Sequence, residues 1–596
     1  METKERKPLG FGKTMLASAV GVIVAFAVMN VISFIFLVGM IMSMAMSLSD
    51  KTAAIEGEGL MLSIDLDQPM SEHSGTDIQD LFGKNERLAM DQVLRAIEAA
   101  ESDDKVSGIY LSSQQGGSWD WAQSEEVREA LIGFAQRSGK PVVAYGEAYS
   151  QQGYYVASSA TLIGMHPSGI VDFRGIGVQA MFFKDLVDKL DIHVELIRPK
   201  SNAFKSAGET YTMNHFSEAN KEQNRCYVTS IWNHVAGQMA QARHLTVEQI
   251  NAIADNMEAY IPNDAVRAHI LDTLLFKSDM EKIMKERFGG KKIVAIGKYA
   301  KSLTTKKAKD KIAIIYAEGD VNTGSNEGMT TGIYSDDLVQ AFAQAAEDKE
   351  VKAIVLRVNS PGGAVTASES ITHAFMQAKA KKPVIVSMSG LAASAGYEMS
   401  CNGTVIVAEP TTITGSIGVF AMIPEVGGML KNKLGISIDT LQTNRNATGI
   451  GIMAPLSATA HAKMQRSVEE FYVTFCQRVA KGRNLPTSYV DSIARGRVWT
   501  GIEAKRLGLV DTLGGLGLAL RIAAEKAGIE DYQVTSLPKS KSMADQLLSW
   551  GSKETDDIVL KGNKAERCIR MMMKEIDYWC EMEPLQARLP FVVVEQ

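Results

Sequence analysis

Two stretches of the chain share one pattern of apolar and polar positions. Residues 96–111 read Ala-Ile-Glu-Ala-Ala-Glu-Ser-Asp-Asp-Lys-Val-Ser-Gly-Ile-Tyr-Leu, and residues 341–356 read Ala-Phe-Ala-Gln-Ala-Ala-Glu-Asp-Lys-Glu-Val-Lys-Ala-Ile-Val-Leu. In each stretch, apolar residues at helical spacing precede a short charged turn, which leads into an apolar run. The pattern predicts a helix, a turn and a buried strand at both places.

Further blocks repeat in the same order. The Gly116-Gly117 pair matches Gly362-Gly363, residues 140–154 match 382–397, and residues 265–274 match 504–513. The offset of about 240 residues excludes a solenoid and indicates a duplicated domain. Because helices alternate with short apolar strands, each copy is predicted to be an α/β domain with largely parallel strands. The predicted divisions are a first repeat at 55–297, a lysine-rich linker at 298–311, a second repeat at 312–535 and a C-terminal appendage at 536–596, to which we assign no chemistry.

The N-terminal region contains a long apolar run. Residues 14–49 carry no charged side chain. This exceeds the roughly 20 residues needed to cross a bilayer and the roughly 7–15 of a cleavable signal peptide. Because Lys4, Arg6, Lys7 and Lys13 precede the run, residues 1–13 are predicted to stay in the cytoplasm, with the body of the chain outside it. We therefore predict that residues 14–49 form a transmembrane anchor, and a buried core helix is the alternative.

Composition excludes several classes of protein. Of 596 residues, 45% are hydrophobic and 22% are charged, which is typical of a globular body of more than one domain. The net charge of −6 gives no case for binding nucleic acid. The five cysteines show no metal-binding spacing, so we expect no metal and no cofactor, and a Cys568–Cys580 disulfide is left open.

The two copies differ where chemistry is expected. When their Gly-Tyr pairs are matched, Gln151 stands opposite Ser394. Conversely, the first copy has Lys205 in a segment, residues 198–206, whose counterpart at 443–450 contains no lysine. Because each copy keeps a group that the other lacks, the asymmetry predicts one composite site.

A turn for an oxyanion is predicted beside the serine. Asn359-Ser-Pro-Gly-Gly363 follows the predicted strand 353–358, and ligand sites in open α/β sheets lie at such strand ends. Paired glycines let the backbone turn sharply and present bare N–H donors, which a helix beginning near 364–368 would reinforce. Taken by itself, a Pro-Gly-Gly segment is more typical of an ordinary turn.

The serine requires a base, and the histidines are poorly placed for that role. Ser394 follows the predicted strand 383–387 among small residues, a setting that can expose a nucleophile or simply reflect tight packing. Neither His373 nor His461 lies beside an acid in a motif-like setting. Lysine can replace histidine if burial lowers its pKa, and Ala203, Phe204 and Ala207 would surround Lys205 suitably. Out of context, a lysine is a solvated surface charge.

The chain resembles the signal peptide peptidase A (protease IV) family in its long double-domain form, within the superfamily of Clp protease and crotonase folds. The resemblance covers roughly residues 55–535 together with the anchor. It rests on Asn359-Ser-Pro-Gly-Gly363, Ala392-Ala-Ser-Ala-Gly-Tyr397, Thr414-Gly-Ser-Ile-Gly418, Arg495-Gly-Arg-Val-Trp-Thr-Gly501 and Gly508-Leu-Val-Asp-Thr-Leu-Gly-Gly515.

The resemblance implies roles for particular residues. Ser394 would be the nucleophile, Lys205 the general base, and Ser416 the residue that orients the lysine. The backbone N–H groups of Gly363 and Ala395 would form the oxyanion hole. The family usually has glycine where this chain has Ala395, which matters only if that position requires a positive φ.

The resemblance also implies a setting. The chain would be a single-pass protein of the inner membrane, with its catalytic body on the periplasmic side. It would assemble as a homotetramer and degrade apolar peptides, including remnants of cleaved signal peptides. Two alternatives stay open: a non-catalytic scaffold of the same fold, and a crotonase-type acyl-CoA enzyme. The sequence does not identify the substrates, or whether Ser394 and Lys205 meet within one chain.

Overall fold

The computed structural model describes residue 29 and residues 55–74, 87–117, 119–304, 307–326, 332–538 and 585–588. The chain divides into two compact units, Met1–Glu56 and Gly57–Gln596. Apart from Met29, which is helical and exposed, the predicted anchor at 14–49 lies outside the described residues, as do Cys568 and Cys580. Among the helices that the structure describes, none combines the length and apolarity needed to span a bilayer. Both repeats belong to the second unit.

The first repeat is built on a six-stranded sheet in the order β8-β6-β5-β4-β1-β9, with every neighbouring pair parallel. Its strands are β1 (Leu60–Asp65), β4 (Val106–Ser113), β5 (Val142–Tyr149), β6 (Leu162–Val171), β8 (Thr273–Leu274) and β9 (Lys292–Ala295). The helices of this repeat are α3 (Met90–Ser102), α4 (Trp121–Ser138), α5 (Gln151–Ala157), α6 (Lys184–Lys189), α7 (Glu209–Thr212), α8 (Glu218–Arg243), α9 (Val247–Asp255), α10 (Pro262–Arg267), α11 (Lys277–Phe288) and α12 (Ile296–Ser302).

The second repeat has the same strand order. Its path β20-β16-β15-β13-β10-β21 follows the first sheet strand for strand, and β17 and β19 extend it beyond β15. The strands are β10 (Asp310–Glu318), β13 (Val351–Ser360), β15 (Val384–Ala393), β16 (Val405–Ala408), β17 (Ile413–Gly415), β19 (Val498–Thr500), β20 (Thr512–Leu513) and β21 (Tyr532–Leu537). The helices are α13 (Ser335–Glu347), α14 (Val365–Lys379), α15 (Ala395–Ser400), α16 (Gly427–Asn432), α17 (Ala458–Arg483), α18 (Thr487–Ile493), α19 (Gly501–Arg506) and α20 (Leu516–Ala527).

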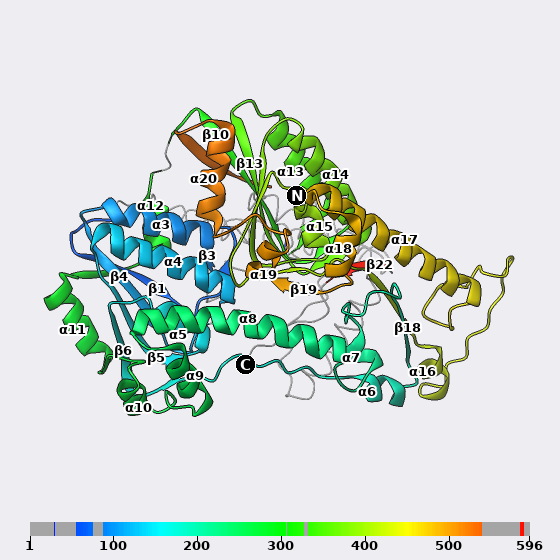
Figure 1. Cartoon of the computed structure of the whole chain (residues 1–596), viewed down its shortest axis with the longest axis horizontal. Helices are drawn as coiled ribbons and strands as arrows, with labels where there is room; N and C mark the ends of the chain where they lie inside the picture. The colour runs from blue at the N-terminus through cyan, green and yellow to red at the C-terminus, as the bar shows by residue number, and fades with distance from the viewer. Residues whose placement is uncertain are drawn as a thin grey trace, which may run out of the picture. The chain divides into compact units, whose positions relative to one another are not determined.

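A third sheet joins the two repeats. Its order is β12-β11-β14-β22-β18-β7. Within it, β7 of the first repeat runs antiparallel to β18 of the second. The strands are β7 (His193–Ile197), β11 (Val321–Asn322), β12 (Ile333–Tyr334), β14 (Gly362–Ala364), β18 (Phe420–Glu425) and β22 (Leu585–Arg588), while β2 (Met70–Ser71) and β3 (Leu88–Ala89) pair separately. Figure 1 shows α8 running from α7 back to the first sheet.

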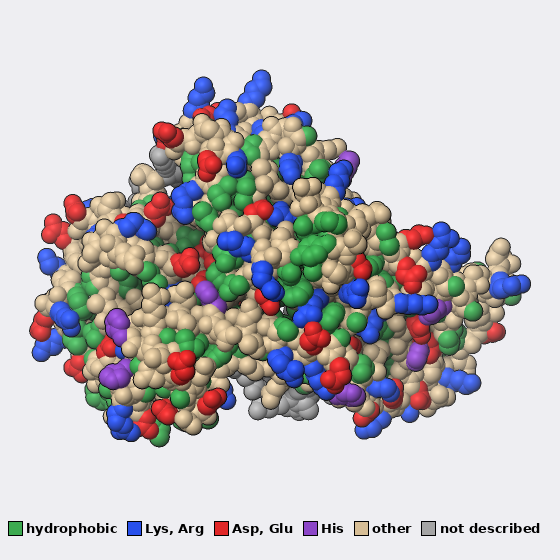
Figure 2. Space-filling model, viewed as in Figure 1, with side chains coloured by type: hydrophobic (Ala, Val, Ile, Leu, Met, Phe, Trp, Pro, Cys, Tyr) green, Lys and Arg blue, Asp and Glu red, His purple; other side chains and the backbone are tan. Residues whose placement is uncertain are grey.

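Burial follows the predicted patterns. In α13 the buried positions include Leu338, Ala341, Phe342 and Ala345, one face of a helix, while β13 is buried almost throughout, as a parallel strand covered on both faces should be. These residues belong to the largest apolar cluster, which also contains Tyr397. On the surface, lysines and arginines are interspersed with acidic side chains (Figure 2).

Two predicted segments enter the fold further than the sequence suggested. The lysine-rich stretch 298–311 overlaps α12 and β10, because Ile296, Tyr299 and Ala300 pack one face of α12 into the core. Residues 536–537 complete β21 and residues 585–588 form β22, so the predicted appendage contributes to two sheets.

Candidate active site

Ser394 occupies a sharp turn between β15 and α15. Its φ of 56° and ψ of −115° lie outside the regions that L-residues normally adopt. The turn is held by two hydrogen bonds of 2.8 Å, in which the Ser394 N–H donates to the Gly415 carbonyl and the Glu398 N–H donates to the Ser394 carbonyl. Gly396 fits beneath it because a Cβ there would lie 2.9 Å from the Ser360 carbonyl oxygen. A strained strand-to-helix turn of this kind can present a nucleophilic hydroxyl.

Lys205 reaches the second repeat on a loop of the first. The loop follows β7, which is anchored along β18. The Phe204 N–H donates to the Arg495 carbonyl at 3.1 Å, and the Arg198 guanidinium donates to the Lys205 carbonyl at 2.8 Å. A Cβ on Gly496 would lie 2.5 Å from the Lys205 Cβ, so the backbones are in direct contact. The Arg495-Gly496 motif therefore receives the lysine loop.

The structure brings Lys205, Ser394 and Ser416 together within one chain. The Lys205 Nζ lies 2.7 Å from the Ser394 Oγ. It also lies 3.0 Å from the Ser416 Oγ and 3.2 Å from the Ser416 carbonyl oxygen. Ser416 follows β17 with φ 49°, and its N–H donates to the Arg497 carbonyl at 2.8 Å. Two oxygens of Ser416 thus direct the amine toward Ser394.

The environment of Lys205 favours the neutral amine. The side chains of Lys205, Ser394 and Ser416 are completely buried. Burial lowers the pKa of Lys205 well below its usual range, because the ammonium loses its hydration. In the described part of the chain, no carboxylate lies within ion-pair distance of this amine to restore the charge. A neutral amine at 2.7 Å from a hydroxyl can accept its proton.

The predicted oxyanion donors lie on adjoining elements. Ala395 is the first residue of α15, so its N–H has no acceptor within the helix. Its φ is not positive, so alanine fits where the related family usually has glycine. Gly363 lies in β14 at φ 156°, and a Cβ there would lie 2.2 Å from the Val321 carbonyl oxygen. Only glycine can be accommodated at that position without moving β11.

The histidines lie away from this pair. The exposed His461 pairs with Glu195 at 3.1 Å, and His373 contacts Gln377 at 3.0 Å. Within the described residues, no group of three or more histidine, cysteine, aspartate or glutamate side chains is arranged to hold a metal ion. Neither His373 nor His461 is among the polar contacts of the Lys205 amine and the Ser394 hydroxyl.

Comparison with known proteins identifies the family. The model of peptidase family S49 matches residues 135–290 and 376–530, once in each repeat, and the Clp protease model matches residues 305–410. The chain belongs to peptidase family S49. It is 34% identical over 536 residues to Protease 4 of Salmonella typhi, with 86% of each chain covered.

Two further relatives extend the match across most of this S49 chain. It is 29% identical to Protease 4 of Haemophilus influenzae, covering 92% of this chain and 94% of the relative. It is 28% identical to the chloroplastic serine protease SPPA of Arabidopsis thaliana, covering 86% and 76%. The predicted family and the duplicated α/β fold are therefore confirmed, and the family names support a serine peptidase.

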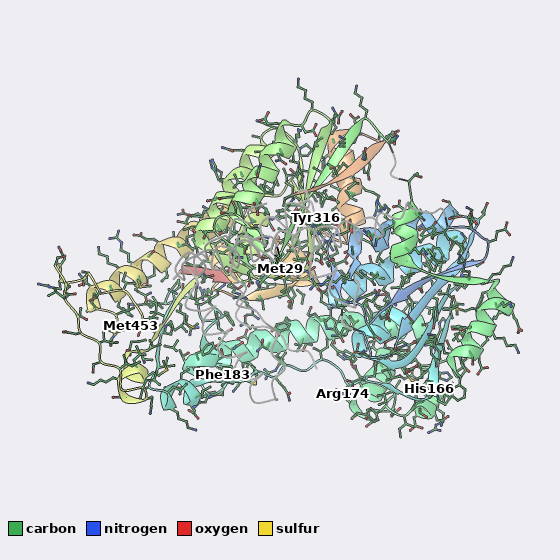
Figure 3. The ribbon with its side chains drawn as sticks, turned by 180° about the vertical axis from the view of Figure 1, so that it is seen from behind. Met29, His166, Arg174, Phe183, Tyr316 and Met453 are labelled. Carbon is green, nitrogen blue, oxygen red and sulfur yellow. The ribbon has the colours of Figure 1, made fainter. Side chains whose placement is uncertain are left out.

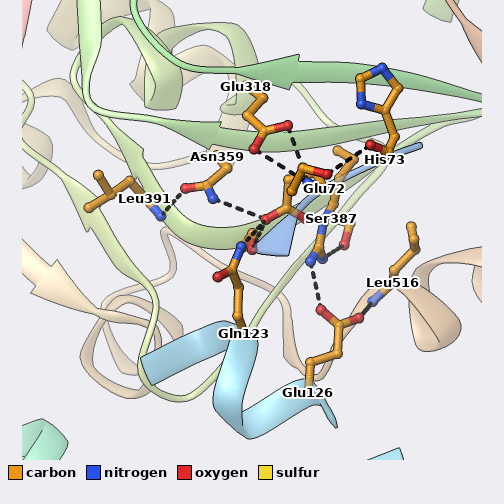
Figure 4. A network of polar contacts seen from close by, with 12 residues as sticks. Glu72, His73, Gln123, Glu126, Glu318, Asn359, Ser387, Leu391 and Leu516 are labelled. Carbon is orange, nitrogen blue, oxygen red and sulfur yellow. Dashed lines mark hydrogen bonds and ion pairs between the residues drawn. The ribbon is translucent and has the colours of Figure 1, made fainter. Parts of the chain in front are cut away.

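A buried ionic network beneath the site was not predicted from the sequence. Arg357 of β13 pairs with Glu72 at 2.7 Å and with Glu126 at 2.6 Å, and all three side chains are buried (Figure 4). Both glutamates come from the first repeat. Their charges hold the pKa of Arg357 above its usual range despite its burial, and Arg357 holds the pKa of Glu72 below its usual range. This S49 peptidase thus joins its repeats through charge as well as through the lysine loop.

Glu72 also supports the strands that carry the candidate site. Its Oε1 accepts hydrogen bonds from Asn359 at 3.0 Å and from Ser389 at 2.6 Å (Figure 4). Asn359 in turn accepts from the Leu391 N–H at 3.1 Å, which bridges β13 and β15 just before the oxyanion turn and Ser394. Burial raises the pKa of the neighbouring Glu318 to about 7. Sequence alone gave no signal for Glu72, because one glutamate before a loop resembles any surface residue.

Proposed function

We propose that this protein is a serine endopeptidase in which Ser394 is the nucleophile and Lys205 is the general base. The observation that carries the proposal is the 2.7 Å separation between the Lys205 Nζ and the Ser394 Oγ. It is supported by the buried setting that lowers the pKa of the lysine, and by membership of family S49. The two halves then divide the work, since the first supplies the base and the second supplies the nucleophile.

The chemistry follows from this arrangement. Neutral Lys205 accepts the Ser394 proton as Oγ attacks the scissile carbonyl carbon. The N–H groups of Gly363 and Ala395 donate to the oxygen that becomes negative. The Lys205 ammonium then gives its proton to the departing amine, and the acyl-enzyme forms. Water, deprotonated by the same amine, attacks the ester and releases the second product and free Ser394. Ser416 keeps the amine oriented through both stages.

The substrates are proposed to be apolar peptides in extended form, including remnants of cleaved signal peptides. Support comes from the relatives, which are named as proteases. We further propose that residues 14–49 anchor the chain in the inner membrane, with the catalytic body on the periplasmic side. The uncharged run and the basic residues before it support that orientation.

A homotetramer is also proposed. The segment between α16 and α17 exposes apolar side chains that a monomer would normally bury, and Met453 marks it in Figure 3. These side chains are Leu434, Ile436, Ile438, Leu441, Ile450 and Met453. Sedimentation of the detergent-solubilised chain tests this assembly, and Leu441→Asp combined with Ile450→Asp should reduce the oligomer mass.

Active-site labelling tests the catalytic proposal. A fluorophosphonate probe should label the wild-type chain once, and Ser394→Ala should abolish both labelling and peptide hydrolysis while preserving assembly. Ser400→Ala, a second buried serine in α15, provides the matched control and should retain labelling. Retention of hydrolysis by Ser394→Ala would overturn the proposal. Absence of labelling in a folded wild-type chain would favour a non-catalytic scaffold, and turnover of an acyl-CoA would favour a crotonase-type enzyme.

A further inference from the structure

The two predicted oxyanion donors stand at the beginnings of two different helices. Gly363 comes shortly before Val365, the first residue of α14, whereas Ala395 is the first residue of α15. Two N–H groups stabilise one oxyanion only when both already point at the place where the charge develops. An oxyanion hole of this kind therefore requires that the start of α14 be fixed relative to the start of α15.

Glu398 of α15 contacts both of these places. Its backbone N–H donates to the Ser394 carbonyl at 2.8 Å, so its main chain belongs to the strained turn. Its side-chain carboxylate accepts a hydrogen bond of 2.6 Å from the Ser368 hydroxyl in the first turns of α14. That length is typical of a charge-assisted hydrogen bond, and neither side chain has any exposed surface. One residue thus joins the turn of the nucleophile to the helix that follows Gly363.

Arg478 of α17 compensates the charge of this carboxylate. Its guanidinium pairs with Glu398, and it also pairs with Glu369 of α14 at 3.1 Å. The Arg478 side chain is partly buried, whereas the Glu369 side chain is partly exposed. A carboxylate without exposed surface needs such a partner, because it has lost its hydration. The ion pair therefore ties α17 to both α14 and α15.

A glutamate is a costly residue at this position if its only role is to fill space. Its neighbours in α15, Tyr397 and Met399, belong to the largest apolar cluster, and an apolar side chain there would carry no desolvation penalty. Helix α15 has only six residues, so its placement depends on tertiary contacts. A carboxylate supplies direction as well as contact, because its hydrogen bonds fix how Ser368 and Arg478 approach it.

We propose that Glu398 is a positioning residue, which fixes the N–H groups of Gly363 and Ala395 relative to each other. Ser368 and Arg478 hold its carboxylate in place for this role. The inference rests on the proposed peptidase function and adds to it the residue that aligns the oxyanion donors. Because these donors act on the charge that develops in the transition state, loss of the alignment should lower kcat and leave substrate binding unchanged.

The first experiment measures kcat and KM for a fluorogenic peptide with the full-length protein. Glu398→Ala releases α15 from α14, and kcat should fall by about 10- to 100-fold while KM stays within about twofold of wild type. Glu398→Gln keeps an oxygen that can accept from Ser368, so it should recover part of the lost rate. Glu369→Ala removes the other partner of Arg478 and is the matched control, with kcat close to wild type. A raised KM with unchanged kcat in Glu398→Ala would overturn the proposal.

A smaller substitution tests the same contact from α14. Ser368→Ala removes one hydroxyl, which the fold should tolerate, and kcat should fall by about three- to tenfold. The Ki of a peptide aldehyde should rise by the same factor as kcat/KM falls, because its tetrahedral adduct with the serine places an oxygen against the same donors. Ser370→Ala, at an exposed serine whose hydroxyl donates to the Thr366 carbonyl, is the control and should change neither value. Unchanged kcat and Ki in Ser368→Ala would overturn the alignment.

Hydrogen exchange separates this inference from the peptidase proposal. Exchange is followed by mass spectrometry in the segments 359–368 and 394–401 of the full-length Ser394→Ala chain. Adding Glu398→Ala should accelerate exchange in both segments by about fivefold or more, whereas adding Glu369→Ala should not. The measurement needs no turnover, so it decides the contact even if the fluorophosphonate leaves the wild-type serine unlabelled. Acceleration in fewer than both segments would overturn the inference even if that serine is labelled.

Discussion

The turn after β15 and the turn after β5 occupy equivalent places in two copies of one fold, yet only the first is strained. Ser394 precedes α15 with φ 56°, whereas Ser150 precedes α5 with φ −69°. The Ser150 hydroxyl accepts from the Gly153 N–H at 3.1 Å, an ordinary helix cap. Gln151, opposite Ser394 in the sequence match, accepts from the N–H groups of Arg174 and Gly175 at 3.0 and 2.7 Å.

The turns that contain paired glycines, Gly116-Gly117 and Gly362-Gly363, also differ between the two repeats. In the first repeat the Asp67 carboxylate accepts from the N–H groups of Gln114, Gln115 and Gly117 at 2.6, 2.9 and 2.9 Å. An internal anion thus occupies the donors that an oxyanion would require. A pocket lined by Gln151 and Arg174 lies beside the turn after β5, and Arg174 is labelled in Figure 3. The comparison teaches that duplication preserved the frame in both copies, whereas only the turn of the second repeat is strained and lies beside a buried amine, which the first repeat supplies.

Among the substitutions that test this comparison, removal of the Lys205 amine should have the largest effect on activity. Lys205→Met leaves Ser394 without a base, and we expect kcat/KM to fall by about 10³-fold or more. The same change should raise the free energy of unfolding at neutral pH by about 1–2 kcal/mol. The sign follows from the lowered pKa: the unfolded chain binds a proton at Lys205 that the folded chain excludes, so this lysine destabilises the fold as pH falls below 10.5.

Peptide hydrolysis and denaturant unfolding, measured on one preparation, check both expectations. Lys200→Met, on an exposed lysine near the same loop, is the control and should change neither quantity. A stable but fully active Lys205→Met chain would remove the lysine from the mechanism.

A substitution in the buried ionic network of Glu72, Glu126 and Arg357 should have the next largest effect, which is on the free energy of unfolding. Glu72→Ala leaves Arg357 buried with only Glu126, and we expect a loss of about 3 kcal/mol in unfolding free energy. Glu72→Gln keeps the shape and should lose less. Glu101→Ala, which breaks the exposed pair with Arg137, is the matched control and should cost under about 1 kcal/mol. If Glu72→Ala and Glu101→Ala lost the same unfolding free energy, Glu72 would stabilise the contact between the repeats no more than an exposed ion pair does.

The pH profile tests which state of Lys205 is active. Because burial lowers the pKa of Lys205, the neutral form persists well below pH 10.5 and hydrolysis should continue there. Below the lowered pKa, kcat/KM should fall about tenfold per pH unit, because protonated lysine cannot accept the serine proton. Rates measured from acidic to alkaline pH at constant ionic strength give the profile. A rate that rose only near pH 10.5 would mean that Lys205 is not buried in the working enzyme.

Ser416 should have a smaller influence. Ser416→Ala removes the hydroxyl at 3.0 Å from the amine but leaves the carbonyl at 3.2 Å. One lost hydrogen bond of about 1 kcal/mol corresponds to roughly a five- to tenfold fall in kcat, with KM unchanged. Ser416→Thr restores the hydroxyl and should recover part of the rate. A fall in KM alone, without a change in kcat, would contradict an orienting role.

Much of the frame could be predicted from sequence because it depends on local periodicity. The helix–turn–strand pattern at 96–111 and 341–356 corresponds to α3 with β4 and to α13 with β13. The proximity of Ser394 and Lys205 could also be inferred, since each copy lacked what the other kept. These features leave a signal in adjacent residues or in the comparison of two repeats.

Other features depend on contacts that no local pattern encodes. Glu72 acquires its role from Arg357, which is 285 residues away in the chain. Strand β22 has four residues, which are too few for a periodic signal. It is a strand because it pairs with β14 and β18, which are distant in the sequence. The positive φ of Ser394 arises from the hydrogen bonds around it and cannot be deduced from the residue type, because serine seldom adopts that conformation.

Restoring a serine to the first repeat should have the smallest effect on activity. In a Ser394→Ala background, Gln151→Ser places a hydroxyl opposite the original position, yet we expect no labelling by a fluorophosphonate and no peptide hydrolysis. Asp67 still fills the donors of the glycine turn, and the segment opposite the lysine loop, residues 443–450, contains no lysine. Losing the Gln151 contacts with Arg174 and Gly175 should lower stability by only about 1–2 kcal/mol. Labelling of the new serine would show instead that the strained turn and the buried amine are dispensable, and that the two copies differ in one side chain alone.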